Sequence, residues 1–223
     1  MAQPLATWTH RRAVDVGAAA LGLTLLIGCG TVARHGTVGP LELDVFRAIN
    51  RMPDVLSPAM RSVQLLGTFA IGPVVAVVAL ALRRWRLASA ALLVTAGKLL
   101  AERTVWQVVQ RSRPGTTIAG AIVRGDVPRT GASFVSGHVV LLTGLAWVIT
   151  PYLHGAWRAL PWVVVGLVAF ARVYLGAHAP LDVVGGVGLG AALGGLANLV
   201  VGVPVDIQPT PTPRANPPEV QPA

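Results

Sequence analysis

The sequence contains few charged residues, and only one cysteine and one lysine. Charged residues make up 12% of the 223, about half the share of an average soluble domain. Cys29 has no second cysteine to pair with, which excludes an intramolecular disulfide. Lys98 is the single lysine, so the net charge of +9 comes almost entirely from arginine. The acidic residues form no cluster typical of a Mg²⁺ site, so we expect neither a metal nor another cofactor.

Apolar residues take the place of the missing charge. They account for 53% of the chain, and the mean hydropathy is +0.64. A helix needs roughly 20 residues to cross a bilayer, and six stretches approach that length: residues 13–33, 65–82, 88–108, 136–153, 159–176 and 182–203. The second is an unbroken run from Leu65 to Leu82, which predicts one continuous span. We therefore predict an all-α polytopic membrane protein, a six-transmembrane-helix bundle forming one domain over residues 13–203.

Both ends of the chain are predicted to be tails. Residues 1–12 are polar, and residues 204–223 are rich in proline and lack an apolar face, which is typical of disorder. The segment Leu26–Cys29 follows a basic start and an apolar run and resembles a bacterial lipoprotein cleavage site. We favour the alternative, in which residues 13–33 remain as an uncleaved helix.

The basic residues give an orientation and a class of partner. Arg83, Arg84 and Arg86 cluster between the second and third spans, which places that turn inside by the positive-inside rule. Four further arginines (Arg34, Arg47, Arg51 and Arg61) then fall in the first external loop and oppose this orientation. In a chain of membrane spans, the basic excess favours anionic lipid headgroups over nucleic acid. Charges in the third loop (Arg124, Asp126 and Arg129) are expected to be solvated.

Small residues predict how the last span packs. Gly186, Gly190 and Gly194 recur every four residues and therefore share one helix face. Glycines at this spacing allow the backbones of two helices to approach closely. We expect this face to be a packing surface.

Ionisable residues interrupt the apolar pattern at its edges. Arg172, His178 and Asp182 lie between the fifth and sixth spans, where charge is costly and usually serves a function. Two other polar segments, residues 111–114 and 133–138, flank the third and fourth spans. An up-and-down bundle brings these three segments to the same side of the membrane, and the orientation above makes that side external.

The residue types in these segments suit phosphoryl transfer. Arginine guanidinium groups match phosphate oxygens, and Ser136 and the Gly137 N–H at a helix start can donate to the same anion. Of the two histidines, His178 and His138, one can attack phosphorus while the other protonates the leaving oxygen. Asp182, four residues after His178, can hold its ring in the required tautomer. We predict transfer through a phosphohistidine.

The same three segments resemble the type 2 phosphatidic acid phosphatase (PAP2) superfamily, integral-membrane lipid phosphatases related to vanadium haloperoxidases. The family pattern is Lys-x6-Arg-Pro, then Pro-Ser-Gly-His, then Ser-Arg-x5-His-x3-Asp. The resemblance extends from about Leu41 to Val203. The third motif keeps its spacing but begins with Ala171, the second has Val135 for proline, and Trp106 takes the lysine position of the first. The resemblance implies a six-helix bundle of the PAP2/haloperoxidase-like type.

Roles follow from the matched positions. The resemblance implies that His178 is the nucleophile, Asp182 its orienting partner, and His138 the general acid and then the base for water. It also implies phosphate binding by a set of four residues: Arg113, Arg172, Ser136 and Gly137.

The missing motif lysine leaves open which cation completes the phosphate site. Arg103, about one turn before Trp106, and Arg111 are the expected substitutes. Lys98 precedes Trp106 by about 12 Å along a helix, which is expected to be too deep. Lys98 and Glu102 are spaced to form an ion pair, and we expect them only to pair with each other.

The expected activity is that of a metal-independent lipid phosphate phosphatase at the outer face of a bacterial cytoplasmic membrane. Phosphatidic acid, phosphatidylglycerol phosphate and a polyprenyl diphosphate are the candidate substrates. Two alternatives remain. The three motif departures are compatible with a degenerate protein that binds or moves anionic lipids without hydrolysing them. The other alternative is an enzyme that transfers the phosphoryl group to an acceptor other than water.

Overall fold

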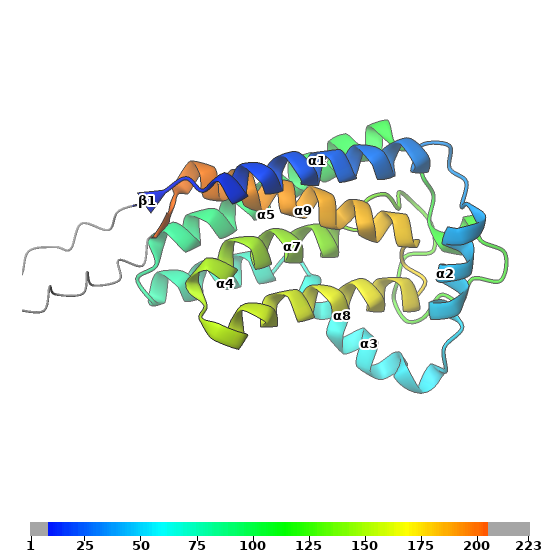
Figure 1. Cartoon of the computed structure of the whole chain (residues 1–223). Coiled ribbons are helices and arrows are strands. Elements are labelled where there is room, and N and C mark those ends of the chain that lie inside the picture. Colours follow the sequence, from blue (N-terminus) through cyan, green and yellow to red (C-terminus); the bar gives the residue numbers. More distant parts are fainter. Residues whose placement is uncertain (1–8, 205–223) are drawn as a thin grey trace, which may run out of the picture.

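The computed structural model describes residues 9–204 and is almost entirely helical, as predicted. Six of its helices run along a common axis (Figure 1): α1 (Ala13–Ala33), α4 (Ile71–Ala81), α5 (Trp85–Val108), α7 (Gly137–Ile149), α8 (Leu160–Tyr174) and α9 (Pro180–Val201). Helix α9 packs against α1, α7 and α5, and α8 packs against α7. The last helix of the chain is therefore central to the bundle.

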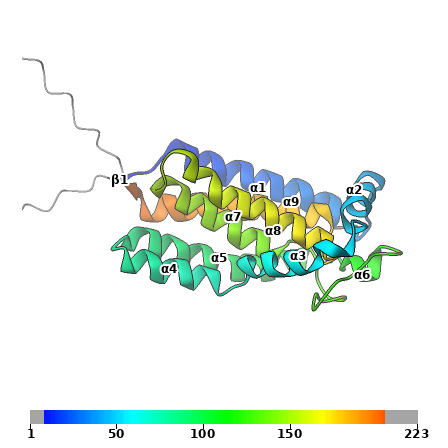
Figure 2. The ribbon, with the colours of Figure 1, turned by 90° about the horizontal axis from the view of Figure 1, so that it is seen from below.

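Shorter elements close one end of the bundle. Helix α2 (Pro40–Asn50) lies across the end opposite to β1, and α6 (Pro114–Thr117) lies at the same end (Figures 1 and 2). Helix α3 (Ser57–Gln64) packs against α8. Four 3₁₀ turns complete the helical content: η1 (Asp54–Leu56), η2 (Leu65–Gly67), η3 (Thr150–Tyr152) and η4 (Gly155–Ala159).

The two chain ends of the described region meet at the other end of the bundle. Strand β1 (Thr9–His10) pairs antiparallel with β2 (Val203–Pro204). The part of each predicted tail next to the bundle therefore belongs to a short strand pair. The remainder of both predicted tails, residues 1–8 and 205–223, lies outside the described residues.

Fewer helices than six meet both the length and the hydropathy expected of a membrane span. Within residues 9–204, three do so: Ala13–Ala33, Gly155–Tyr174 and Pro180–Val201. A bent pair, Asp54–Gly67 with Ile71–Ala81, gives a fourth if it counts as one span. Helix α5 is long enough but carries several charges, whereas α7 is apolar but short.

The prediction of one continuous span over residues 65–82 is wrong. The chain leaves η2 at Thr68 in an extended conformation, restarts as α4 at Ile71, and bends by 60° between the two parts. Pro73 falls in the first turn of α4, where its missing N–H costs no helical hydrogen bond. The hydropathy of the run is continuous across this break, so it gave no sign of the bend.

The predicted glycine face of α9 is confirmed as a packing surface against α7. A Cβ atom on Gly190 would lie 2.5 Å from the Val140 carbonyl oxygen, and one on Gly194 would lie 2.6 Å from Cβ of Trp147. Gly186 faces Val139 of the same helix. Because Gly190 and Gly194 have no room for a side chain, the two backbones approach closely and α7 is fixed beside α9.

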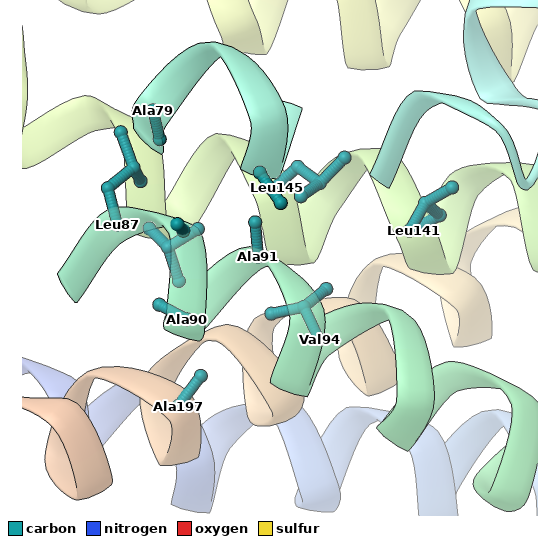
Figure 3. Close-up of a cluster of buried hydrophobic side chains, with 11 residues drawn as sticks. Ala79, Leu87, Ala90, Ala91, Val94, Leu141, Leu145 and Ala197 are labelled. Carbon is teal, nitrogen blue, oxygen red and sulfur yellow. The ribbon is translucent and has the colours of Figure 1, made fainter. Parts of the chain in front are cut away.

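A cluster of small buried residues joins α4, α5, α7 and α9 in the half of the bundle away from α2 (Figure 3). Ala91 and Val94 of α5 are fully buried there, beside Leu141 and Leu145 of α7. Gly144 of α7 has no room for a Cβ because Val94 occupies that space. This contact sets how far along α5 the first residue of α7 lies, which matters for the site described next.

Candidate active site

The three polar segments meet at the end of the bundle covered by α2, as predicted. The Ser136 N–H donates to the carbonyl oxygen of Asp182 at 2.9 Å, which joins the second and third segments. The Ser133 N–H donates to the carbonyl oxygen of Arg111 at 2.8 Å, which joins the first and second. Backbone hydrogen bonds therefore hold the segments together independently of their side chains.

His178 lies in the turn between α8 and α9 and is 3% exposed. Its Nδ1 atom lies 3.7 Å from Oδ2 of Asp182 and 3.5 Å from the Ser133 hydroxyl. Asp182 is held by the hydroxyl of Ser133 at 2.5 Å and by the N–H of Ala179 at 2.9 Å. With Nδ1 directed at the carboxylate, Nε2 of His178 keeps its lone pair for attack on an electrophile.

Burial lowers the pKa of His178 to about 4, although the nearby carboxylate of Asp182 opposes the shift. The ring is therefore neutral, and nucleophilic, at physiological pH. An ordinary histidine titrates near 6.5. Between pH 6.5 and 4, His178 is therefore protonated in the unfolded chain but remains neutral in the folded protein.

We expect this histidine to destabilise the folded protein on acidification. The free energy of unfolding is unaffected by this group above pH 6.5. It falls by on the order of 3 kcal/mol as the pH decreases to about 4. The measurement is the thermal midpoint in detergent from pH 7.5 to 4 for the wild type and His178→Asn. The difference between the two proteins should shrink or reverse on acidification, and a constant difference would contradict the assigned shift.

Arg111 does not lie in the phosphate site as expected. It is 1% exposed, and its guanidinium donates to Oδ1 of Asp182 at 3.1 Å and to Oε2 of Glu42 at 2.6 Å. The other oxygen of Glu42 accepts the N–H of Leu181. Because two carboxylates occupy the guanidinium, Arg111 supports Asp182 and is not available as a substitute for the missing lysine.

Three buried donors at the site have no hydrogen-bond partner in residues 9–204: Nε of Arg113, Nε of Arg172 and the hydroxyl of Ser136. Arg113 donates through Nη1 to the carbonyl oxygen of Ala177 at 3.0 Å. Arg172 donates through Nη1 to Gln64 at 2.5 Å. Burial lowers the pKa of Arg113, opposed by the charge of Asp182. Buried donors normally find an acceptor, so this arrangement is suited to an anion that the protein itself does not supply.

His138 is half-buried in the first turn of α7, beside the unpartnered donors. Its ring packs on Gly67 of η2, where a Cβ atom would lie 2.8 Å from Cδ2. The positive charges of Arg172, Arg113 and Lys98 lie close enough to interact electrostatically with the His138 ring. Gly137 is the first residue of α7, and Ser136 precedes it without capping the helix through its side chain. The N-terminus of α7 is therefore open to an anion.

The structure separates the residues near the missing motif lysine. Trp106 is 38% exposed, and Arg103 is also exposed. Within residues 9–204, the side chain of Arg103 makes no hydrogen bond or ion pair with the site residues above. The predicted ion pair of Lys98 and Glu102 is confirmed at 2.6 Å. Lys98 was expected to lie too deep for the site, but it lies beside the first residue of α7: a Cβ on Gly137 would lie 2.9 Å from Cε of Lys98. Helix α7 begins well inside the bundle, at the level of Lys98.

Several residues near the site were not identified from the sequence as having a role there. Glu42 and Gln64 come from α2 and α3, outside the three motifs, and no pattern marked them. Ser133 stands at the start of the polar segment 133–138, two residues before the second motif, and had no assigned role. Lys98 did carry a signal, because a lone lysine within an apolar span is unusual.

In the third loop Asp126 and Arg129 are exposed as predicted, but the prediction is wrong for Arg124. Arg124 is not solvated but 6% exposed, and it donates to Asp54 and to carbonyl oxygens of α2 and α8. Arg124 therefore holds the loop against the neighbouring helices.

Within residues 9–204, no group of three or more His, Cys, Asp or Glu side chains is arranged to hold a metal ion.

The fold matches those of known structures. The fold resembles the crystal structure of Aquifex aeolicus LpxE, with a TM-score of 0.66 and 20% identity over 71% of this chain and 95% of that one. It also resembles a transmembrane PAP2-type phosphatidylglycerolphosphate phosphatase from Bacillus subtilis, with a TM-score of 0.62 and 22% identity over 82% and 94% of the two chains. No curated protein sequence matches. A family model, the PAP2 superfamily, matches residues 85–203, which is more than half of the sequence and includes all three motifs. The chain belongs to the PAP2 superfamily and is a membrane phosphatase of that family.

Proposed function

We propose that the protein is a metal-independent lipid phosphate phosphatase that works through a phosphohistidine. One observation carries the proposal: two histidines lie beside three buried donors that have no acceptor. A tetrahedral phosphate can accept from all three donors while its phosphorus faces Nε2 of His178. The arginines would then neutralise charge that metal ions neutralise in other phosphoryl-transfer enzymes.

Two steps follow from this arrangement. Nε2 of His178 forms a bond to phosphorus as the bond from phosphorus to the lipid oxygen breaks, and His138 gives its proton to that leaving oxygen. Water then attacks phosphorus, His138 takes a proton from the water, and the bond to His178 breaks to release phosphate. Asp182 stabilises the positive charge that forms on His178 during the first step.

An apolar cavity next to the site favours a lipid over a soluble phosphate. It has a volume of about 300 Å³, lies between α1 and α5, and reaches Phe134, two residues before Ser136. Leu26 and Val105 line it, and Arg34 stands at its edge. This cavity can take part of a hydrocarbon chain while the phosphate lies among the arginines. The known activity of the Bacillus subtilis neighbour, on phosphatidylglycerolphosphate, agrees with a lipid substrate.

We propose that all six long helices cross the membrane and that the site faces outward. Arg83 and Arg84 lie in the turn between α4 and α5, and Arg86 lies in the first turn of α5. This turn is at the end of the bundle away from α2 (Figure 1). By the positive-inside rule that end is cytoplasmic. The charged stretch of α5 faces the interior at Lys98 and Glu102, which permits this helix to cross despite its charges.

The test is phosphate release by the purified protein from phosphatidic acid, phosphatidylglycerol phosphate and a polyprenyl diphosphate, each with and without EDTA. We expect release from at least one lipid at an unchanged rate in EDTA, and incorporation of ¹⁸O from labelled water into the phosphate. Lipid binding without release would instead support the non-hydrolysing alternative. Consumption of the lipid without ¹⁸O in free phosphate would support transfer to another acceptor.

A further inference from the structure

Helix α5 carries its only lysine at an unexpected depth of the site. Lys98 and Glu102 are largely buried, with side chains 14% and 11% exposed, and both contact Gly137 at the start of α7. From Lys98 to the end of α5 the helix runs ten residues, about 15 Å. The start of α7 is therefore well below the end of α5, and the phosphate site lies at the level of Lys98.

The surroundings of the ammonium group call for an additional anion. Lys98 has three N–H protons, and one ion-pair contact, with Glu102, is found. The charges of Lys98, Arg113 and Arg172 all reach His138. Arg113, Arg172 and Ser136 each have a buried donor without a partner in residues 9–204. The carboxylates of the site, Glu102 and Asp182, are already paired with Lys98 and Arg111. A doubly charged phosphate would balance the two remaining cations, Arg113 and Arg172.

Glu102 has a separate effect on the position of Lys98. A cation beside a helix N-terminus is repelled by the partial positive charge of the unpaired N–H groups there. Glu102 contacts Gly137 at that N-terminus and holds the ammonium at 2.6 Å. The carboxylate therefore keeps Lys98 in a place that it would otherwise leave.

We propose that Lys98 is the phosphate-binding cation that replaces the lysine missing at Trp106, and that Glu102 positions it. The inference rests on the phosphatase function proposed above. Nζ of Lys98 donates to a non-bridging phosphate oxygen next to His138, on the side of the anion away from Arg113. Its charge stabilises the oxygens as the bond to His178 forms. The chain thereby has a third cation at the site although the first motif lacks its lysine.

The test compares kcat/KM and the inhibition constant for orthovanadate among four variants. Lys98→Met should lower kcat/KM by about 10² to 10³-fold and weaken vanadate binding. Lys98→Arg should recover most of the vanadate affinity, because it restores the charge. Arg51→Met removes an exposed cation from the same end of the protein and should leave kcat/KM within about twofold of the wild type.

The fourth variant separates binding from folding. Lys98→Met alone leaves Glu102 without its partner, whereas Lys98→Met/Glu102→Gln removes both charges and is expected to fold, as checked by its thermal midpoint. The double variant should remain poorly active and poorly inhibited. Wild-type kcat/KM and vanadate affinity in a folded double variant would overturn the inference and leave the phosphatase function standing. A wild-type protein inactive on every lipid phosphate would overturn the function instead.

Discussion

Replacing His178 with alanine is expected to lower lipid phosphate release by about 10³-fold or more, because no other group in the described site can take its place as nucleophile. His138, the second histidine, packs against Gly67 and has no carboxylate partner, so it is suited to proton transfer. Of the two histidines, only His178 has a ring oriented by a carboxylate. Its imidazole is also neutral, and donors for the phosphate lie nearby.

The measurement pairs steady-state release with trapping of the covalent intermediate. Wild-type protein mixed briefly with a ³²P-labelled lipid phosphate and quenched should retain label that is stable in base and lost in acid. His178→Ala should retain none. His35→Ala is the matched control, since His35 is exposed in the turn after α1, and it should behave as the wild type. Undiminished release by His178→Ala would remove the proposed nucleophile.

Removing the guanidinium of Arg111 is expected to have the largest effect on stability. Arg111→Met would leave Glu42 and Asp182 buried, close together and without a counter-charge. Breaking a buried pair in this way typically costs about 3–5 kcal/mol. The free energy of unfolding in mixed micelles, from a denaturant titration, should fall by that amount. Activity should fall with it, because Asp182 would no longer be held in place beside His178.

A second substitution tests whether the charge is the cause. Glu42→Gln in the Arg111→Met background removes one of the two stranded carboxylates and should recover part of the lost stability. Glu42→Gln alone should cost less than Arg111→Met, since Asp182 still balances the guanidinium. If the three variants were equally stable, the chain from Glu42 through Arg111 to Asp182 would not support the site as described here.

Much of the site could be predicted because its chemistry is local in sequence. The spacing of His178 and Asp182 brings the two groups together across one turn at the start of α9, whatever the other helices do. The Ser136–Gly137 pair likewise begins α7 next to His138. The partners of the arginines could not be predicted in this way. Glu42 and Arg111 are separated by 69 positions, and Gln64 and Arg172 by 108.

The sequence by itself determined the helical membrane class, the order of the motifs, the packing face of α9 and the two histidines with their carboxylate. Only the tertiary structure decided the bend before α4, the carboxylate pair around Arg111 and the place of Lys98. The physical reason is that periodicity defines which face of a helix is buried but not how far one helix is displaced along another. That displacement depends on contacts such as Val94 against Gly144, which set the start of α7 at the level of Lys98.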